Sequence, residues 1–207
     1  MIDSPLKGAY DAVFSLGANC QTAYQLRRLG LRHAAGPLDW FISSSHSGLI
    51  SVLQNRFVDF MKLEHLKLVG QFKTCYCIKD EKYEIFSYHD FPVELPPDRW
   101  ADAYPGFLDR QVRRQERFLQ AASMMDRILF VRLNSTPEEA LQLQQILSDL
   151  TVHQFTLLIV NTCQEAVQEI RPEFKQGRVT AELSKGSDWR GDDGGWEQLL
   201  QNITIKN

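Results

Sequence analysis

Short apolar blocks, separated by glycine, proline and polar residues, mark the first half of the chain. Residues 12–16 form a bounded apolar run, which is typical of a buried strand. Asn19 is a favourable N-cap for a helix that ends at Gly30, and residues 47–54 predict a second helix. Two segments rich in Tyr, Ile, Phe and Thr flank a polar turn, so we expect an antiparallel hairpin from residues 74–78 and 83–88.

The second half alternates apolar segments with segments of helical pattern. We expect strands at residues 127–133, 155–161 and 178–183 and helices at residues 106–125, 135–150, 164–170 and 194–202. Strands that alternate with helices predict an α/β fold. We therefore expect a three-layer architecture, in which a mostly parallel sheet carries helices on both faces and the β-hairpin is inserted, within a single domain spanning residues 1–207.

The composition narrows the class of protein. Of the 207 residues, 43% are hydrophobic and 24% are charged, which is typical of a globular domain rather than a disordered chain. A net charge of -3 does not match the basic surface of a nucleic-acid-binding protein, so no nucleic-acid partner is expected. Four arginines form a local stripe that acidic residues interrupt. We interpret this stripe as a solvated helix face, with a phosphate-binding patch as the alternative. The stripe consists of Arg110, Arg113, Arg114 and Arg117.

The cysteines and the first residues indicate a reduced, cytoplasmic protein. The start of the chain lacks the regions of a signal peptide, and no apolar run approaches the ~20 residues that span a bilayer, so no membrane partner is expected. Cys20, Cys75, Cys77 and Cys163 are then expected to be free thiols. A single residue separates Cys75 from Cys77, which favours buried structural residues over a metal site. We therefore expect neither a metal nor a cofactor.

Cys20 is the strongest candidate for chemistry, because it stands where a strand and a glycine turn lead into a helix. Unpaired N–H groups at a helix start carry partial positive charge, so a thiol there is expected to ionise more easily. The backbone N–H groups of Cys20 and Gln21, with the amide of Asn19, could stabilise an oxyanion. The alternative is a buried and inert cysteine.

A cysteine nucleophile requires a base, and His89 is the favoured one of five histidines. It ends a predicted strand and opens a loop, a junction where functional residues are common. His33, His46, His65 and His153 are interpreted as surface residues. A carboxylate could orient the imidazole. Asp39 is favoured for this role because Asp90, the neighbour of His89, would point to the opposite face of a continuing strand.

Further residues are candidates for contacts with a substrate. Arg132 is a cation in an apolar strand, so it should pair with a core carboxylate such as Asp39 or Asp90, or else bind an anionic substrate group. Trp40, Asn19 and Gln21 are also expected near the substrate. The segment Asp188–Trp196, rich in glycine and acidic residues, predicts a loop that its tryptophans attach to the core, with a lid or a sugar-stacking platform as alternatives.

Several blocks together resemble a bacterial family of unknown function that is catalogued with the papain-like cysteine peptidases. The resemblance extends from about residue 12 to residue 200, and its first block is the most specific. It implies a cysteine nucleophile and a histidine base, which fall on Cys20 and His89, and it implies a papain-like α+β fold. The matching blocks are Ser15–Cys20, Leu26–Arg32, Pro37–Trp40, His89–Phe91, Phe130–Arg132 and Trp189–Trp196.

Two hypotheses about function follow. The first is a cysteine-nucleophile hydrolase or acyl-transfer enzyme that acts on a peptide, an amide or a thioester, and so binds a peptide or small-molecule substrate. The second is a Rossmann-like module without catalytic activity, which would bind a phosphate or a sugar-nucleotide at the Gly17 turn with help from Arg132. The second requires a glycine-rich turn, and this chain has one glycine where dinucleotide sites have three.

Overall fold

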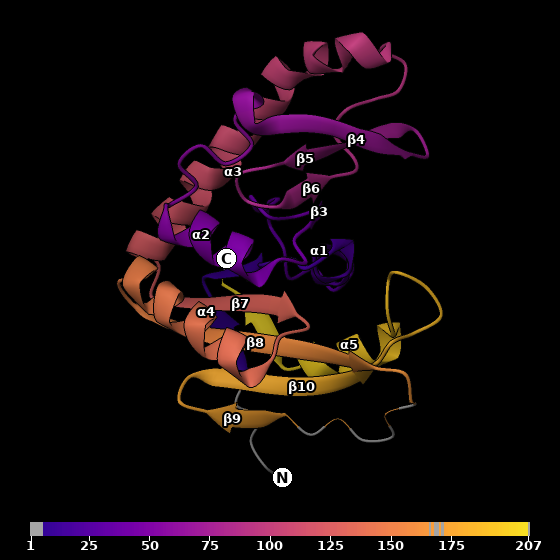
Figure 1. The fold of residues 1–207 in the computed structure, drawn as a ribbon. Helices are drawn as coiled ribbons and strands as arrows, with labels where there is room; N and C mark the ends of the chain where they lie inside the picture. Colours follow the sequence, from indigo (N-terminus) through magenta and orange to yellow (C-terminus); the bar gives the residue numbers. More distant parts are fainter. Residues whose placement is uncertain (1–5, 166, 168–169, 171, 207) are drawn as a thin grey trace.

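A five-stranded sheet forms the centre of the molecule in the computed structural model, which describes residues 6–165, 167, 170 and 172–206. Four of its strands are parallel and the edge strand β9 is antiparallel, in the order β2-β7-β8-β10-β9 (Figure 1). The strands are β2 (Ala12–Ser15), β7 (Arg127–Leu133), β8 (Gln154–Cys163), β9 (Glu173–Lys175) and β10 (Arg178–Ser184). The predicted strands 127–133, 155–161 and 178–183 are thereby confirmed.

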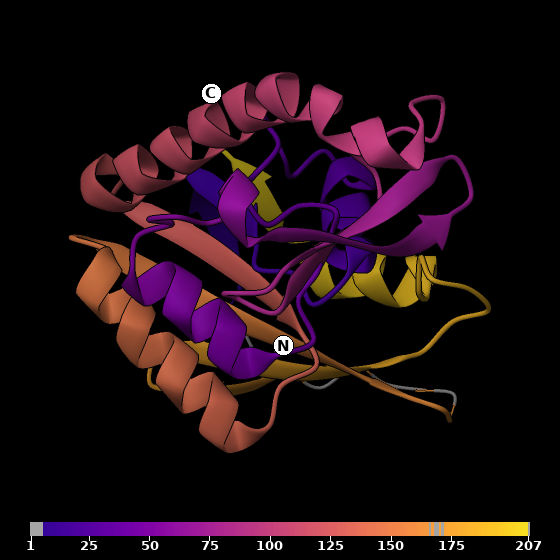
Figure 2. The same cartoon turned by 45° about the horizontal axis from the view of Figure 1, so that its top comes forward.

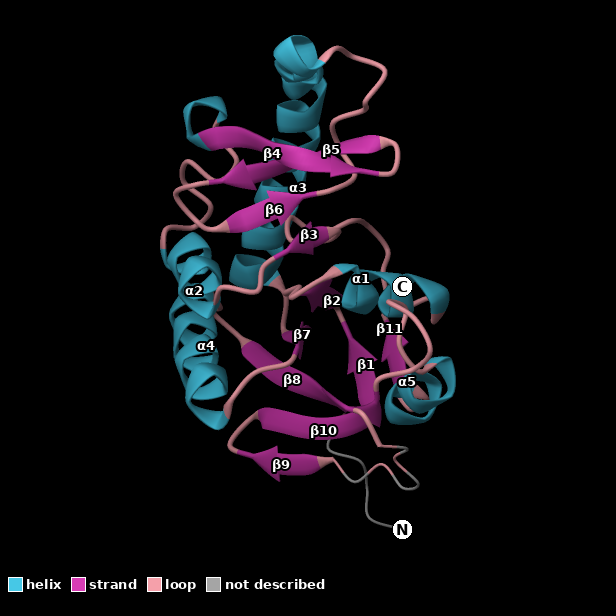
Figure 3. Ribbon diagram, turned by 45° about the vertical axis from the view of Figure 1, so that its right-hand side comes forward, coloured by secondary structure: helices cyan, strands magenta, loops and turns pink. Residues whose placement is uncertain are grey.

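Apolar residues of the central strands point alternately into two cores, one on each face of the sheet. In β7, Ile128 and Phe130 belong to one core, whereas Leu129 and Val131 belong to the other, as expected for a strand buried on both faces. Helices α2 (His46–Gln54), α3 (Tyr104–Met124) and α4 (Pro137–Leu150) supply side chains to the first core. Helices α1 (Cys20–Arg28) and α5 (Asp193–Leu200) supply the second. Figure 3 shows α2 and α4 on one side of the strands and α1 and α5 on the other.

Local signals explain where these helices begin. Thr136 caps α4: its side chain accepts a hydrogen bond from the Glu139 N–H, and the Glu139 side chain accepts one from the Thr136 N–H. Pro137 at the first helical position needs no hydrogen-bond acceptor for its nitrogen. Helix α1 begins after Asn19, whose side chain accepts from the N–H of Gln21.

A separate antiparallel sheet lies beyond the end of the central sheet, and the long helix α3 runs alongside both (Figures 1 and 2). Its order is β3-β6-β5-β4, from strands β3 (Phe41–Ile42), β4 (Leu66–Phe72), β5 (Cys75–Asp80) and β6 (Ile85–Ser87). The predicted hairpin is confirmed as β5 and β6, which pair antiparallel. Strand β4 was not predicted, because most of its residues are exposed and its apolar pattern is weak.

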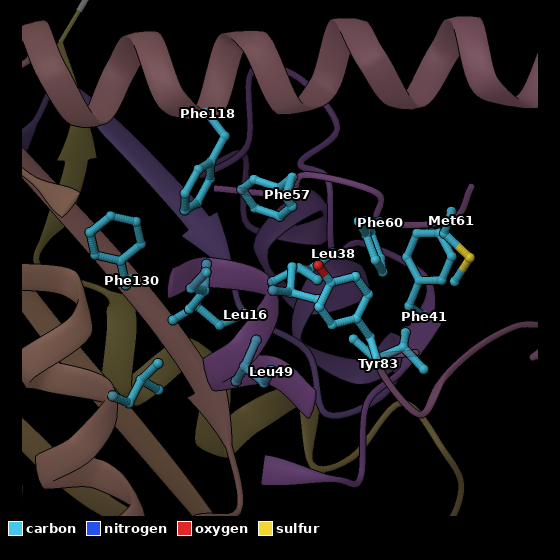
Figure 4. Close-up of a cluster of buried hydrophobic side chains, with 14 of the residues drawn as sticks. Leu16, Leu38, Phe41, Leu49, Phe57, Phe60, Met61, Tyr83, Phe118 and Phe130 are labelled. Atoms are coloured by element: carbon cyan, nitrogen blue, oxygen red, sulfur yellow. The ribbon is translucent and has the colours of Figure 1, made fainter. Parts of the chain in front are cut away.

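Aromatic residues join the two sheets through one continuous core, shown in Figure 4. Phe118 of α3 lies 5.3 Å from Phe57 and 5.7 Å from Phe130 of β7, measured between ring centroids. Phe60 contacts both Phe41 of β3 and Tyr83. This packing fixes β3 and β6 against the end of the central sheet, where α1 begins.

The remaining elements are short. Strands β1 (Gly8–Tyr10) and β11 (Ile203–Ile205) pair in parallel, and the 3-10 helices η1 (Leu63–His65) and η2 (Pro97–Ala103) flank the second sheet. Of the predicted helix at residues 164–170, the structure describes residues 164, 165, 167 and 170, and none of these four is helical; residues 166, 168 and 169 lie outside the described residues. Within the part of the chain that the structure describes, no helix is long and apolar enough to cross a membrane.

Candidate active site

The turn between β2 and α1 places Cys20 at the carboxyl end of the central sheet. Gly17 has φ +78°, and a Cβ there would lie 2.5 Å from the Ser43 Oγ, so only glycine suits this turn. Thr22 donates a hydrogen bond from Oγ1 to the Gly17 carbonyl at 3.2 Å, and Asn19 caps the helix through the Gln21 N–H at 2.8 Å. Cys20 is therefore held in the first turn of α1.

His89 meets Cys20 from the other sheet. The Cys20 Sγ lies 3.3 Å from the His89 Nε2, although 69 positions separate the two residues in the chain. His89 follows β6 by two residues, and its ring forms a T-shaped pair with the Trp40 ring, with 6.0 Å between the centroids. The thiol also lies 3.8 Å from the Trp40 carbonyl. The imidazole is exposed, whereas Cys20 is only 9% exposed.

The prediction that the Cys20 thiol ionises more easily is wrong. Burial, together with the charge of Asp39, raises the pKa of the Cys20 thiol to about 11. The residue's own backbone N–H acts in the opposite direction but is outweighed. The N–H at the helix start lowers the pKa of the thiol, as the sequence suggested, but burial raises this pKa by more. The resting thiol is therefore neutral near pH 7, and its reactivity requires a base.

Neither predicted carboxylate hydrogen-bonds to the imidazole of His89. Asp39 is buried, forms an ion pair with Arg32, and accepts a hydrogen bond from the Gly36 N–H at 2.9 Å. Burial raises the pKa of Asp39, and Arg32 opposes that effect. Asp90 accepts from the Ser87 Oγ at 2.7 Å. Both residues hold loops beside the site, so the prediction that one of them orients His89 is not met by the geometry.

Arg132 holds the backbone and does not pair with a carboxylate. Its guanidinium donates to the Leu16 carbonyl at 2.8 Å and to the Ser43 Oγ and carbonyl at 2.8 and 2.7 Å. The predicted pairing with Asp39 or Asp90 is therefore wrong: carbonyl oxygens of the two loops around Cys20 take the place of a carboxylate. Arg132 is buried, and with Ser43 it fills the space beside Gly17 where the alternative hypothesis placed a phosphate.

Donors for an oxyanion are fewer than the sequence suggested. The N–H of Gln21 is already bonded to the Asn19 side chain. The Gln21 side chain is buried against Gly191, and a Cβ added at position 191 would lie 1.9 Å from the Gln21 Nε2. The Gln21 side chain therefore packs against the 188–191 loop. The N–H of Cys20, at the first helical position, and the Nδ2 of Asn19 remain as donors next to the sulfur.

Two cavities meet at His89 and Trp189. The first, here called the apolar cavity, has a volume of about 550 Å³ and contains Cys20. It is lined by Asn19, Cys20, Ile42, Phe72, Lys73, Thr74, Tyr88, His89 and Trp189. The second, here called the basic cavity, has a volume of about 560 Å³. It is lined by Tyr24, Arg27, Trp40, His89, Asp90, Arg114, Trp189 and Arg190.

Sequence reasoning missed several of these lining residues. Trp189 is 53% exposed, packs on Tyr24 with 5.3 Å between ring centroids, and borders both cavities, whereas Trp196 is fully buried in the core. The packing interpretation is therefore confirmed for Trp196, whereas Trp189 lies at the surface beside both cavities, and the lid and sugar-stacking alternatives stay predictions. Arg27 was detectable from its spacing, because seven residues after Cys20 a helix returns to the same face.

The described part of the chain contains no group of three His, Cys, Asp or Glu residues able to hold a metal ion. Cys75 and Cys77 are free thiols on β5, with Cys77 buried and Cys75 partly buried. A third cavity, of about 550 Å³, lies at the opposite end of β2, where Val13, Phe14, Met124 and Met125 line it. It does not reach Cys20.

Comparisons with known proteins agree with this emphasis on a cysteine. A family model described as "Putative papain-like cysteine peptidase (DUF1796)" matches residues 11–165, which include both Cys20 and His89. The chain is also 26% identical over 220 residues to "Uncharacterized protein R408" of Acanthamoeba polyphaga mimivirus, with 93% of this chain and 98% of the viral protein covered. The sequence resemblance was to a bacterial family, whereas this relative is viral. No solved structure matches the chain.

Proposed function

We propose that this chain, which belongs to the family described as "Putative papain-like cysteine peptidase (DUF1796)", is a hydrolase that cleaves acyl substrates such as peptides or amides through Cys20 and His89. The observation that carries the proposal is the 3.3 Å separation between the Cys20 Sγ and the His89 Nε2. This is the range in which a nucleophile can transfer its proton to a base. A cavity of about 550 Å³ opens directly on the pair.

The neutral thiol determines how the first step proceeds. Because the pKa of Cys20 is about 11, His89 removes the proton as the sulfur attacks, rather than storing it in a preformed ion pair. The bond from sulfur to the acyl carbon forms, the bond from that carbon to the leaving group breaks, and His89 passes the proton to the leaving group. Water then adds to the acyl carbon with His89 as base, the carbon–sulfur bond breaks, and the proton returns to the sulfur.

The oxyanion of each tetrahedral intermediate requires hydrogen-bond donors on the Cys20 side of the substrate. The Cys20 N–H points toward its own sulfur, where it lowers the pKa of the thiol against the effect of burial. The Asn19 side chain borders the same cavity, and its oxygen is fixed by the Gln21 N–H. That bond orients the Asn19 Nδ2 as a second donor. Loss of one such donor typically reduces the rate about 10²–10³-fold.

No carboxylate is needed to position His89 in this proposal. The imidazole forms a T-shaped pair with the Trp40 ring, and the Trp40 carbonyl is close to the sulfur. When Nε2 accepts the thiol proton, Nδ1 carries the other proton of the imidazolium. The proposed machinery is a dyad with an aromatic support.

Alkylation of the thiols near pH 7 tests the proposal. With a pKa of about 11, only about one Cys20 thiol in 10⁴ would be ionised at pH 7 without a base. We therefore expect iodoacetamide to label Cys20 before Cys75, Cys77 and Cys163, and His89→Ala to slow this labelling at least tenfold. His153→Ala, which removes an exposed histidine far from the site, is the matched control.

The pH dependence of labelling separates assisted from unassisted reaction. In His89→Ala the rate should rise about tenfold per pH unit until the pKa of Cys20, about 11, because only spontaneous ionisation remains. The wild-type rate at neutral pH should lie well above that line. Equal labelling of all four thiols, or a rate at Cys20 that does not change in His89→Ala, would show that the pair does not act as nucleophile and base.

A further inference from the structure

We infer that the substrate's leaving group carries an anion, a carboxylate or a phosphate, which binds Arg27 and Arg114 in the basic cavity, while the acyl group occupies the apolar cavity. The inference rests on the proposed function, because the terms acyl group and leaving group have meaning only if Cys20 is the nucleophile. It assigns a substrate class to the site. It also gives a role to part of the arginine stripe that the sequence analysis interpreted as a solvated helix face.

The positions of the two cavities relative to the sulfur distinguish the two parts of the substrate. The apolar cavity contains Cys20 and Asn19, and so holds both the sulfur and the oxyanion donors. The acyl carbon must lie there, and Ile42, Phe72 and Trp189 offer its substituent an apolar surface. The basic cavity borders His89 but not Cys20. A leaving group accepts its proton from the base, so it must lie on the His89 side.

Three guanidinium groups and one carboxylate line the basic cavity. The charge of Arg190 is matched by Asp188, to whose two carboxylate oxygens the Arg190 guanidinium donates hydrogen bonds. The carboxylate, Asp90, accepts a hydrogen bond from Ser87 and lies 3.7 Å from Arg110 outside the cavity. The remaining positive charges of the basic cavity are those of Arg27 and Arg114.

Arg27 and Arg114 come from different helices and face the same space. Arg27 lies on α1, two turns after Cys20 on the same face, and its guanidinium packs over the Trp40 ring at 5.4 Å from the centroid. Arg114 lies on α3 and is half-buried. Among the described residues it makes no hydrogen bond or ion pair. Burial lowers the pKa of Arg114, while Asp90 and Asp39 at longer range oppose that effect.

A half-buried guanidinium without a partner suits an anionic ligand. Guanidinium groups offer a planar set of donors that bind carboxylates or phosphates through two parallel hydrogen bonds. The tryptophans Trp40 and Trp189 border the same cavity. An acidic amino acid, or the C-terminal carboxylate of a peptide, directly after the scissile bond would satisfy this arrangement, as would a phosphate ester.

Equilibrium binding of small probes tests the inference without requiring catalysis. The probes are N-acetylglycine, its neutral isostere N-acetylglycinamide, and methyl phosphate, each titrated into the protein while the indole N–H signals are followed by NMR. We expect N-acetylglycine or methyl phosphate to bind at least about tenfold more tightly than N-acetylglycinamide. The preference should disappear in the double variant Arg27→Gln/Arg114→Gln.

The matched control is the double variant Arg99→Gln/Arg113→Gln. This control also removes two positive charges, but it removes them from exposed arginines that pair with Asp102 and Asp109 outside the cavity. The control should keep the preference, because long-range attraction to the whole protein changes equally in both double variants. If the first double variant does not fold, Arg27→Gln alone and Arg114→Lys, which keeps the charge but loses the planar donors, provide the same comparison.

Each outcome decides a separate point. Tighter binding of N-acetylglycine than of methyl phosphate assigns the carboxylate as the anion, and the reverse order assigns the phosphate. Equal binding of the charged and neutral probes, or equal loss in the control, overturns the inference even if Cys20 is reactive. A Cys20 that resists iodoacetamide refutes the proposed function, and it also overturns the leaving-group role even where the anion preference persists.

Discussion

Arg132 offers the sharpest test of how the fold supports the site, and the perturbation is Arg132→Met. Its guanidinium joins the Leu16 carbonyl, at the end of β2, to the Ser43 carbonyl and hydroxyl, in the loop after β3. These segments belong to different sheets, and they enclose the turn that leads to Cys20. Methionine fills a similar volume without any donor.

The magnitude follows from two opposing terms. Burial lowers the pKa of Arg132 to about 10, from an ordinary value above about 12, and one pKa unit corresponds to about 1.4 kcal/mol, so the buried charge costs about 3 kcal/mol. Methionine removes this cost, but leaves three acceptors without their donor, at about 1–3 kcal/mol each. We expect the free energy of unfolding to fall by about 2–4 kcal/mol.

Urea denaturation, followed by tryptophan fluorescence and circular dichroism, measures this change. Arg178→Met is the matched control, because Arg178 is also a buried strand arginine but, among the described residues, its side chain donates a single hydrogen bond, to the Gln144 side chain at 3.0 Å. The control should lose about 1 kcal/mol. In Arg132→Met the rate of Cys20 alkylation should also change. A neutral or stabilising Arg132→Met would refute the view that the two loops depend on this guanidinium.

Three further predictions concern residues around the site. Asp39→Asn should lower the free energy of unfolding by about 1–3 kcal/mol through the loss of a buried ion pair, yet alter the rate of Cys20 alkylation less than about twofold, which a stopped-time mass-spectrometric assay would check. Trp189→Ala should leave the melting temperature within about 2 °C, since the side chain is 53% exposed, and raise KM several-fold in a peptide-cleavage assay with little change in kcat. Gly48→Ala should destabilise the protein by about 2 kcal/mol or more in thermal denaturation, although alanine favours helices, because the new Cβ would lie 1.9 Å from the Tyr83 carbonyl oxygen.

The central strands were predictable because their apolar pattern shows that they are buried. The run from Arg127 to Leu133 is apolar at both odd and even positions, which is the pattern of a strand covered on two faces. Strand β4 was missed for the converse reason: Lys67, Gly70 and Gln71 interrupt its apolar residues, and its place at the edge of a sheet depends on β5. Pairing with a distant strand overrides weak local pattern.

Individual candidate residues of the site were easier to find than their hydrogen-bond partners. Cys20 and His89 stand at junctions between a strand and the following segment, and the structure places them in contact. Two of the three acceptors of Arg132 were not accessible to such reasoning, because they are backbone carbonyls, and every residue has one; the third is the Ser43 hydroxyl oxygen. A charged residue in an apolar strand signals that acceptors exist, but side-chain types elsewhere in the sequence do not reveal which ones.

The raised pKa of Cys20 and the exposure of His89 have a joint consequence. The helix start and the burial of Cys20 act on the same thiol in opposite directions, and burial is stronger. A neutral thiol is a weak nucleophile, so in the proposed mechanism it reacts as its proton moves to His89, and the attack is fastest when a substrate excludes water from both cavities. Because His89 is exposed and borders both cavities, the two halves of a substrate would cover it together. A substrate that fills only one cavity would leave the imidazole in contact with water and should react slowly, which connects specificity at the basic cavity to the rate of attack at Cys20.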